Sequence, residues 1–355
     1  MESKNHHAQF SALDSLRGFA AIAVAVFHFS SGGWGGYLAV DFFLVLSGFI
    51  LSHRYLYKDE KTKPVEFVAH RLARLYPLHL YTLITFIGAW MLSSGGFPAY
   101  EDGTIFTLFQ QITLTQNVGL NPSGMTWNYP SWSISVEFWI NIIFILFISR
   151  ETKNSTLFLL SLLGLVVIYI NTGNLDTHAA NYYGVINSGM IRGAASFLLG
   201  ILAYRIHQRY KNYQGRKAFR FFSYLEAVCL IGVAGILFER DGSQSSLDFI
   251  APYIFMLVVV VFSFEQGGIS RFVKMFRYLG TISYSIYLNQ ITVLLLSTYL
   301  ADKWHAPGAA LFVQYILVLL VYSHYTYRFI ERPLRIKGRD LFSAHAVGRR
   351  NMKLL

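Results

Sequence analysis

The sequence predicts an all-α integral membrane protein, a polytopic bundle of about ten transmembrane helices whose N- and C-termini both lie in the cytoplasm. Composition is the first reason: of the 355 residues, 54% are hydrophobic, 17% aromatic and only 14% charged. A soluble domain usually carries about 25% charged residues. This chain therefore lacks the charge to cover a surface that faces water, and its many tyrosines and tryptophans suit the membrane interface.

Ten apolar runs are the second reason, because a helix needs about 20 mostly apolar residues to cross a bilayer. The runs cover residues 14–33, 37–56, 75–93, 131–149, 156–171, 186–205, 221–238, 248–264, 279–300 and 309–330. They divide the chain into an N-terminal segment 1–13, a membrane domain 14–330 and a basic tail 331–355. The first segment shows no convincing signal-peptide cleavage site, so we expect the first run to be retained.

The charge of the loops is the third reason, and it also predicts the orientation. If ten helices cross the membrane, successive loops lie on opposite sides. The side that holds both termini then has 26 of the 30 lysines and arginines, the other side has two, and Arg17 and Arg192 lie within spans. Basic loops stay in the cytoplasm, so the net charge of +11 indicates a membrane and no nucleic-acid partner. The loop 94–130 carries no lysine or arginine, and its apolar middle predicts an interfacial or re-entrant helix.

Ionisable residues inside a span are costly, and each is therefore a functional candidate. Arg17 and His28 share one face of the first span, because eleven residues make three helical turns plus about 20°. Asp14 lies one turn before Arg17 and can pair with it. A cation near the cytoplasm and a titratable imidazole deeper in suit an anionic donor. Alternatively, Arg17 snorkels and His28 is a satisfied core histidine.

Other spans hold Asp41, Arg192 and Glu137, the last in the segment PSWSISVEFW, which also contains Ser135. Arg192 needs a carboxylate or a wet cavity, and Asp41 and Glu137 are its candidate partners. A structural ion pair is thus an alternative to catalysis for all three residues.

Arg71 and Arg74 lie one turn apart just before the third span. They form either a fork suited to phosphate or ordinary membrane anchors. Tyr284 and Tyr287 share a helix face, for function or for packing alone. We predict no metal site, since the histidines lack metal-ligand spacing, and the single cysteine, Cys229, excludes a disulfide.

Seven segments together resemble the acyltransferase-3 family, bacterial membrane proteins related to the O-antigen O-acetyltransferases. They follow the order of the family over residues 11–336, and the spacing of Arg17 and His28 matches the family's best-known signature. The segments are LDSLRGFAAIAVAVFHF, GYLAVDFFLVLSGFI, RLARLYPL, PSWSISVEFW, SFLLGILAYRI, YLGTISYSIYL and YRFIERPLR.

The resemblance implies an O-acyltransferase that moves an acyl group, usually acetyl, from cytoplasmic acyl-CoA to a hydroxyl of an extracytoplasmic or lipid-linked carbohydrate. His28 would be the catalytic histidine, by direct deprotonation of the acceptor or through an acyl-enzyme. The other essential polar groups of the reaction centre would be Asp41, Ser135 and Glu137, and the donor-binding cations would be Arg17, Arg71 and Arg74.

Structural or acceptor-binding candidates complete the expected site; these are Asp14, Arg192, Tyr284, Tyr287 and Gln290. Gln290 marks a departure, because many family members have histidine there in a YLxH pattern and this chain reads YLNQ. We expect that part of donor or acceptor binding to differ here.

The expected partners are acyl-CoA as a co-substrate, with no bound cofactor, a glycan or lipid-linked sugar, membrane lipids, and either polysaccharide-assembly proteins or a second copy. The expected location is the bacterial cytoplasmic (inner) membrane. One alternative is a transporter or flippase of a polysaccharide pathway, although no paired broken helices appear. Another alternative is a structural subunit that has lost catalysis. The presence of Arg17, His28 and Glu137 argues against it.

Overall fold

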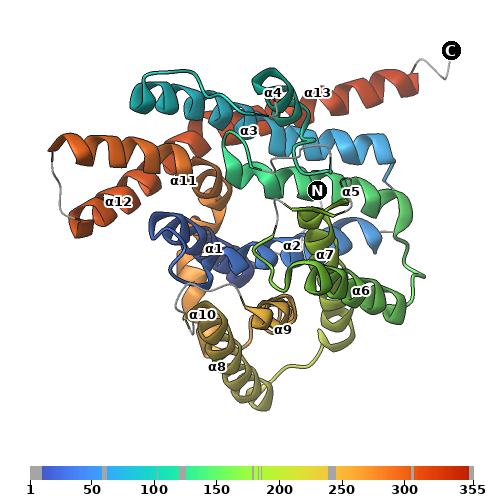
Figure 1. The fold of residues 1–355 in the computed structure, drawn as a ribbon. Coiled ribbons are helices and arrows are strands. Elements are labelled where there is room, and N and C mark those ends of the chain that lie inside the picture. The colour runs from blue at the N-terminus through green and yellow to red at the C-terminus, as the bar shows by residue number, and fades with distance from the viewer. Residues whose placement is uncertain are drawn as a thin grey trace.

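The structure is a computed structural model that describes residues 10–57, 62–101, 103–119, 125–177, 180–182, 184, 186–238, 245–304 and 308–351. Residues 1–9 of the predicted N-terminal segment, residues 352–355 of the tail and parts of the predicted loops lie outside this range. Among the described residues, ten helical segments are long and apolar enough to cross a membrane. The predicted ten-helix bundle is therefore confirmed (Figure 1).

The helices follow one another along the chain, and several continue through short 3-10 or π segments. The α-helices are α1 (Ser11–Phe29), α2 (Ala39–Leu51), α3 (Pro64–Ser94), α4 (Thr104–Thr113), α5 (Trp132–Phe147), α6 (Asn154–Thr172), α7 (Ser188–Tyr210), α8 (Arg216–Phe238), α9 (Ala251–Ser263), α10 (Gly268–Val273), α11 (Arg277–Trp304), α12 (Gly308–Thr326) and α13 (Arg332–Asn351). The 3-10 segments are η1 (Gly35–Leu38), η3 (Tyr129–Ser131), η4 (Ser246–Ile250) and η5 (Lys274–Phe276), and the π segments are η2 (Ser52–Leu56) and η6 (Tyr327–Glu331).

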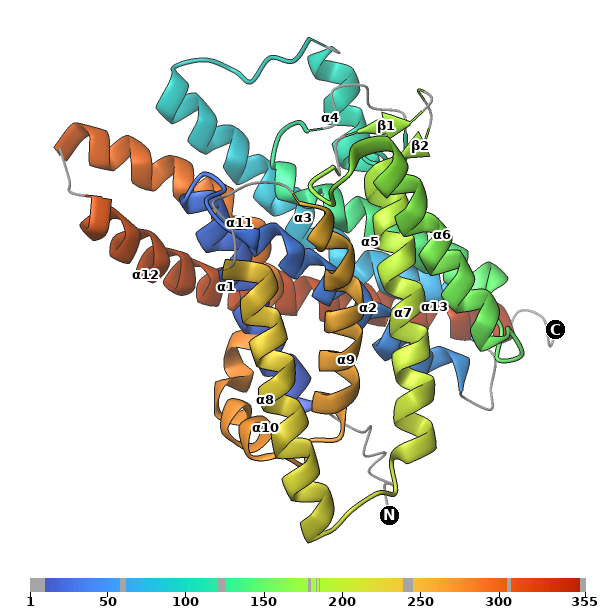
Figure 2. The ribbon, with the colours of Figure 1, turned by 60° about the horizontal axis from the view of Figure 1, so that its bottom comes forward.

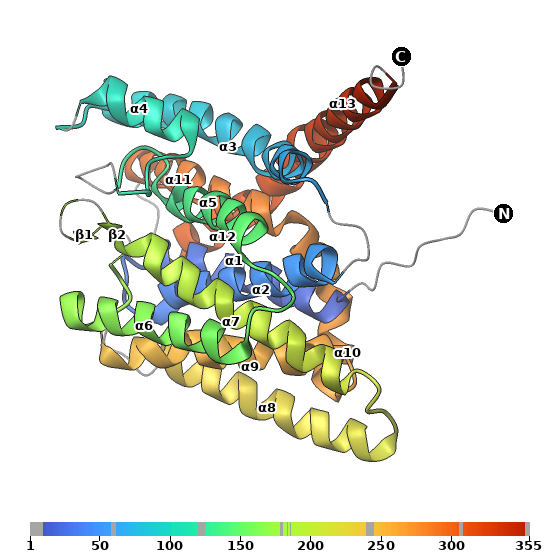
Figure 3. The ribbon, with the colours of Figure 1, turned by 90° about the vertical axis from the view of Figure 1, so that its right-hand side faces the viewer.

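The bundle has two ends, which Figure 3 shows from the side. At the basic end, α1, α3 and α11 begin, and α10 and the connection from α7 to α8 lie there. At the loop end lie α4 and an antiparallel pair of strands, β1 (Asn181–Tyr182) and β2 (Ile186–Asn187) (Figure 2). That the basic end faces the cytoplasm stays a prediction.

α1 and α11 pack side by side and run parallel, since Arg17 lies beside Gly280 and His28 lies beside Gln290. Two glycines allow this close packing. A Cβ on Gly18 would come within 2.5 Å of the Leu279 Cβ, and a Cβ on Gly280 would overlap the carbonyl oxygen of Asp14. Small residues let membrane helices approach closely, so these two glycines bring the polar faces of α1 and α11 together.

α2 and α7 form a second close pair in the same way. A Cβ on Gly48 would overlap the Phe197 carbonyl oxygen, and one on Gly200 would overlap that of Val45. Side chains of α2 and α7 therefore meet with no room for water between the two backbones.

The predicted start of the third span is wrong. The third span, predicted over 75–93, belongs to α3, which begins eleven residues earlier at Pro64, so Arg71 and Arg74 lie inside the helix. Hydropathy misses this start because the first turns are polar, but proline at the first helical position and glutamate in the first turn both favour a helix start. The apolar middle of loop 94–130 forms α4, and the basic tail continues η6 as α13.

Candidate active site

A cavity of about 480 Å³ opens between helices near the basic end. Its walls come from α1, α2, η2, α3, α5 and α11, and its charged residues are unevenly matched. Two carboxylates, Asp14 and Glu137, face four arginines. The arginines are Arg17, Arg54, Arg71 and Arg74. The cavity therefore carries an excess of positive charge and suits an anionic ligand.

Arg17 is fixed at the α1–α11 seam, by which we mean the packed faces of these two helices. Its Nε donates to the Ser283 hydroxyl at 2.8 Å, and its Nη2 donates to the Gly280 carbonyl oxygen at 2.6 Å. Asp14 lies 3.9 Å away, as the one-turn spacing predicts. These contacts orient the guanidinium group and leave it on the cavity wall.

Arg71 and Arg74 come from consecutive turns of α3 and both line the cavity. Arg71 is only 4% exposed, and its Nη1 lies 4.0 Å from the Glu137 Oε1. Its buried Nε has no hydrogen-bond partner in the described part of the chain. An unpaired buried donor is costly, so Arg71 keeps unused hydrogen-bonding capacity at the cavity wall.

The segment PSWSISVEFW presents two polar faces of α5. Ser133 and Glu137, four residues apart, face the cavity, and the Ser47 hydroxyl donates to Glu137 at 3.2 Å. Ser135 and Trp139, also four residues apart, both donate to the carbonyl oxygen of Leu114, at 2.7 and 2.8 Å.

The two faces therefore have different surroundings. Leu114 follows α4 with a left-handed φ of 57°, and Ser135 ties α5 to this turn. Ser135 is fully buried and does not line the cavity, so the structure separates it from Glu137.

Tyr284 and Tyr287 both line the cavity and both use their hydroxyls in hydrogen bonds. Tyr284 donates to the Leu75 carbonyl oxygen at 2.7 Å. Tyr287 accepts from the Ser133 hydroxyl at 2.8 Å. These bonds link α11 to α3 and α5. The two tyrosines therefore both hold the helices together and line the cavity.

His28 lies in the last turn of α1, farther from the basic end than the arginines. Its Nδ1 is 3.0 Å from the Gln290 Oε1, and its ring packs edge-on to that of Tyr129, 5.2 Å between centroids. Gln290 follows the cavity residue Tyr287 by three residues, about 4.5 Å along α11. His28 itself is not on the cavity wall, but its hydrogen-bond partner lies one helical turn beyond it.

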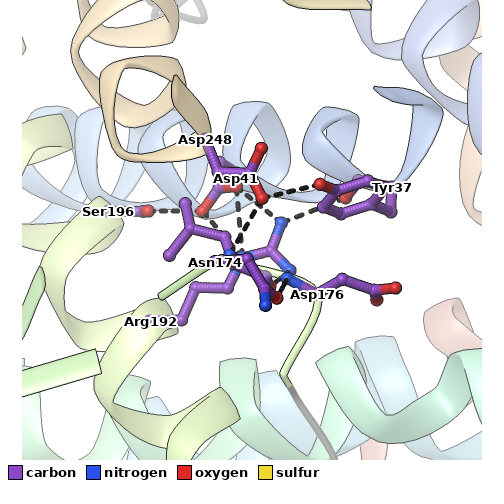
Figure 4. Close-up of polar contacts among 8 residues, drawn as sticks. Tyr37, Asp41, Asn174, Asp176, Arg192, Ser196 and Asp248 are labelled. Carbon is purple, nitrogen blue, oxygen red and sulfur yellow. Dashed lines mark hydrogen bonds and ion pairs between the residues drawn. The ribbon is translucent and has the colours of Figure 1, made fainter. Parts of the chain in front are cut away.

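Asp41 and Arg192 form a separate, fully buried ion pair between α2 and α7 (Figure 4). The Arg192 Nη2 is 2.6 Å from the Asp41 Oδ2, and the Ser196 hydroxyl donates to the Oδ1 at 2.7 Å. Arg192 also donates to the carbonyl oxygens of Leu175 at 2.8 Å and Tyr37 at 3.0 Å. Of the two carboxylates predicted as partners of Arg192, the structure selects Asp41, and this pair does not line the cavity.

Five polar residues of the cavity wall were not among the candidates predicted from the sequence: Ser47, His53, Arg54, Ser133 and Ser283. Arg54 reads as an ordinary basic loop residue, yet it lies in the π segment η2 and lines the cavity. π segments often occur at functional sites, but the sequence alone does not reveal one. Ser283 reads as part of a tyrosine-rich face, and only the register of α1 against α11 shows that it binds Arg17. Within the described range, no cluster of three or more histidine, cysteine or acidic residues could hold a metal ion.

Comparison with known proteins identifies the family. A sequence model of the acyltransferase domain matches residues 10–327. The O-acetyltransferase OatA of Staphylococcus aureus is 24% identical, over 93% of this chain and 58% of its own length. The putative membrane-bound transacylase BcsY of Komagataeibacter xylinus is 25% identical, over 96% and 85%. The putative peptidoglycan O-acetyltransferase YrhL of Bacillus subtilis is 24% identical, over 95% and 57%.

This chain thus spans less than three fifths of the length of OatA and YrhL. No solved structure matches it. The family match covers nearly the whole membrane domain, and it confirms the resemblance carried by the seven ordered segments. The chain is a multi-pass membrane protein and belongs to the acyltransferase-3 family.

Proposed function

We propose that this chain is a membrane O-acetyltransferase that moves the acetyl group of acetyl-CoA to a hydroxyl of a carbohydrate polymer. The α1–α11 seam carries the proposal, because it joins an arginine-lined cavity to His28 within one helical turn. The relatives' names, O-acetyltransferase and transacylase, support acyl transfer over the transporter alternative.

The cavity suits the donor. CoA carries its phosphates on the nucleotide and its thioester at the far end of a flexible arm. Guanidinium groups bind phosphate in a fork and remain charged, so the four arginines would hold the nucleotide at the basic end. The arm would then extend toward Ser133 and Tyr287, with the basic end on the cytoplasmic face. The acyl carbon would thereby come to the part of the seam where Gln290 holds His28.

His28 can assist transfer in two ways. In direct transfer, a ring nitrogen takes the proton of the acceptor hydroxyl while the oxygen attacks the thioester carbon. The C–S bond breaks as the C–O bond forms, and the imidazolium returns the proton to the CoA thiolate. In stepwise transfer, the ring nitrogen attacks first and CoA thiolate leaves an acetyl-imidazole. The hydroxyl then attacks that intermediate, and its proton goes to the thiolate.

We assign different roles to the residues that the motif positions predict to be catalytic. Glu137 faces the cavity beside Arg71 and would position the donor-binding arginine. Asp41 is held by Arg192, and Ser135 by Leu114, so we propose that both are structural. Arg54 would join Arg17, Arg71 and Arg74 in donor binding.

Radiolabel transfer tests the function. Purified protein in proteoliposomes would receive [1-14C]acetyl-CoA and membrane glycans extracted from its own cells. We expect label in the glycan with wild type and with His324→Ala, which lies on α12 away from the cavity, and none with His28→Ala. Transfer at the wild-type rate by a folded His28→Ala protein would overturn the proposal. Mass spectrometry of surface glycans from cells with and without the gene would identify the acceptor hydroxyl.

A further inference from the structure

Gln290 forms the single hydrogen bond that the imidazole ring of His28 makes with the part of the chain that the structure describes. Gln290 is fully buried, and its Oε1 lies 3.0 Å from the His28 Nδ1. The two residues meet because α1 and α11 run parallel, with Arg17 against Ser283 about three turns away. The contact therefore belongs to the α1–α11 seam, whose residues also line the arginine-lined cavity proposed to bind the donor (the donor cavity).

The orientation of the Gln290 amide is fixed by a second contact. Its Nε2 donates to the carbonyl oxygen of Tyr287 at 2.8 Å. If the amide were rotated by 180°, its oxygen would face that carbonyl oxygen, and two acceptors would meet in a buried place. The Gln290 side chain can therefore present only its oxygen to His28.

This orientation decides which nitrogen of His28 carries the proton. An amide oxygen only accepts, so the Nδ1 of His28 must donate. A neutral imidazole has one N–H, and the Nε2 is then left with a free lone pair. The Nε2 makes no hydrogen bond with any described residue, so this lone pair is available to a substrate.

The seam around Gln290 is held in place. The Tyr315 hydroxyl lies 3.4 Å from the Gln290 carbonyl oxygen and 3.3 Å from that of Ala25 on α1. One α12 side chain thus touches both helices at the level of His28. An amide partner differs from a carboxylate in one respect: it fixes the tautomer without adding a negative charge that would hold a proton on the imidazole.

We propose that Gln290 is a positioning residue that keeps His28 in the Nδ1–H tautomer, so that the Nε2 is the atom that takes the acceptor proton or the acetyl group. This inference rests on the proposed function of His28, because it names the reacting atom.

Two variants of similar length separate the amide oxygen from the rest of the side chain. Gln290→Glu keeps an acceptor for the Nδ1 proton, and Gln290→Met has none. Both lose the amide donor to Tyr287, and an ionised Glu also sets an acceptor against that carbonyl oxygen, so the melting temperature of each variant is measured beside its kcat. We expect Gln290→Met to lower kcat for acetyl transfer about 10- to 100-fold with less than a twofold change in KM for acetyl-CoA. We expect Gln290→Glu to retain more of the wild-type kcat than Gln290→Met, and to need a higher pH for it, because a carboxylate would hold a proton on the imidazole.

Nitrogen NMR tests the tautomer without any activity. Wild-type protein and His28→Ala, both labelled with 15N-histidine, would be measured in liposomes. The signals present in wild type and missing in His28→Ala belong to His28. We expect the Nδ1–H tautomer in wild type and a mixture of both tautomers in Gln290→Met. An Nε2–H tautomer in wild type, or equal kcat in Gln290→Met and Gln290→Glu, would overturn the role of Gln290. Transfer by His28→Ala would instead overturn the proposed function and leave the tautomer result intact.

Discussion

The arginine-lined cavity and the α2–α7 pair both place arginine beside carboxylate inside the membrane, but their arginines are paired to different degrees. Arg192 is 1% exposed, and Asp41 together with two carbonyl oxygens accepts its hydrogen bonds. Arg71, in contrast, has a carboxylate only at 4.0 Å and an unpaired Nε. An ionisable residue in a span is a functional candidate by default. These two regions show that its hydrogen-bond partners decide whether it binds a ligand or holds the fold.

The largest effect should come from neutralising the α3 pair. Arg71→Gln combined with Arg74→Gln removes two cations, and charged hydrogen bonds are each worth about 1.5–3 kcal/mol. We expect the KM for acetyl-CoA to rise by at least 100-fold while the protein stays folded. Steady-state kinetics in proteoliposomes measure this, with Arg71→Lys combined with Arg74→Lys as the charge-matched control. An unchanged KM would place the donor elsewhere.

Breaking the buried ion pair should damage stability and spare the chemistry. Arg192→Met leaves Asp41 as an uncompensated buried charge, which costs about 3–5 kcal/mol. We expect a lower melting temperature and yield, with kcat per folded molecule close to wild type. Adding Asp41→Leu should recover at least part of the lost stability, because no buried charge then remains. If the double variant were stable and inactive, Asp41 would have a role in the reaction and not only in the fold.

Arg54→Gln tests whether the π segment η2 contributes to donor binding. Arg54 makes no hydrogen bond or ion pair with the described part of the chain, so its removal should not disturb packing. We expect about a tenfold rise in KM for acetyl-CoA and an unchanged melting temperature. Arg209→Gln, in the last turn of α7 at the same end but off the cavity wall, is the control and should leave KM unaltered. An equal rise in KM in both variants would show that Arg54 acts only through the overall positive charge of this end and does not contact the donor.

The smallest effect should come from the face of α5 that contacts Leu114. Ser135→Ala removes a hydrogen bond to Leu114, worth about 1 kcal/mol, and Trp139 still binds the same oxygen. We expect a small fall in melting temperature and an acetyl-transfer rate within twofold of wild type. A loss of more than tenfold in rate with normal stability would show that Ser135 acts in catalysis, as its motif position predicts.

The sequence predicted what depends on local pattern. Ten apolar runs and the Arg17–His28 face follow from hydropathy and helical periodicity, and the structure keeps both. The start of α3 was missed because its polar first turns lie below any hydropathy threshold. The i, i+4 pairs of α5 were visible in the sequence, but nothing local says which pair faces a cavity.

Other features depend on contacts between distant segments. Gln290 meets His28 across 262 residues, and only the parallel register of α1 and α11 sets that contact. The choice of Asp41 over Glu137 as the partner of Arg192 follows from the close approach of α2 and α7 at Gly48 and Gly200. Such registers come from backbone packing, which one sequence does not display.

Binding of acetyl-CoA to protein in lipid nanodiscs, measured by calorimetry, tests most directly whether the arginine cavity holds the donor beside His28. We predict that His28→Ala binds acetyl-CoA with the wild-type Kd but transfers no acetyl group. Arg71→Gln combined with Arg74→Gln should bind at least 100-fold more weakly. Equal binding by that double variant and wild type, or lost binding in His28→Ala, would contradict the separation of donor cavity from reacting histidine.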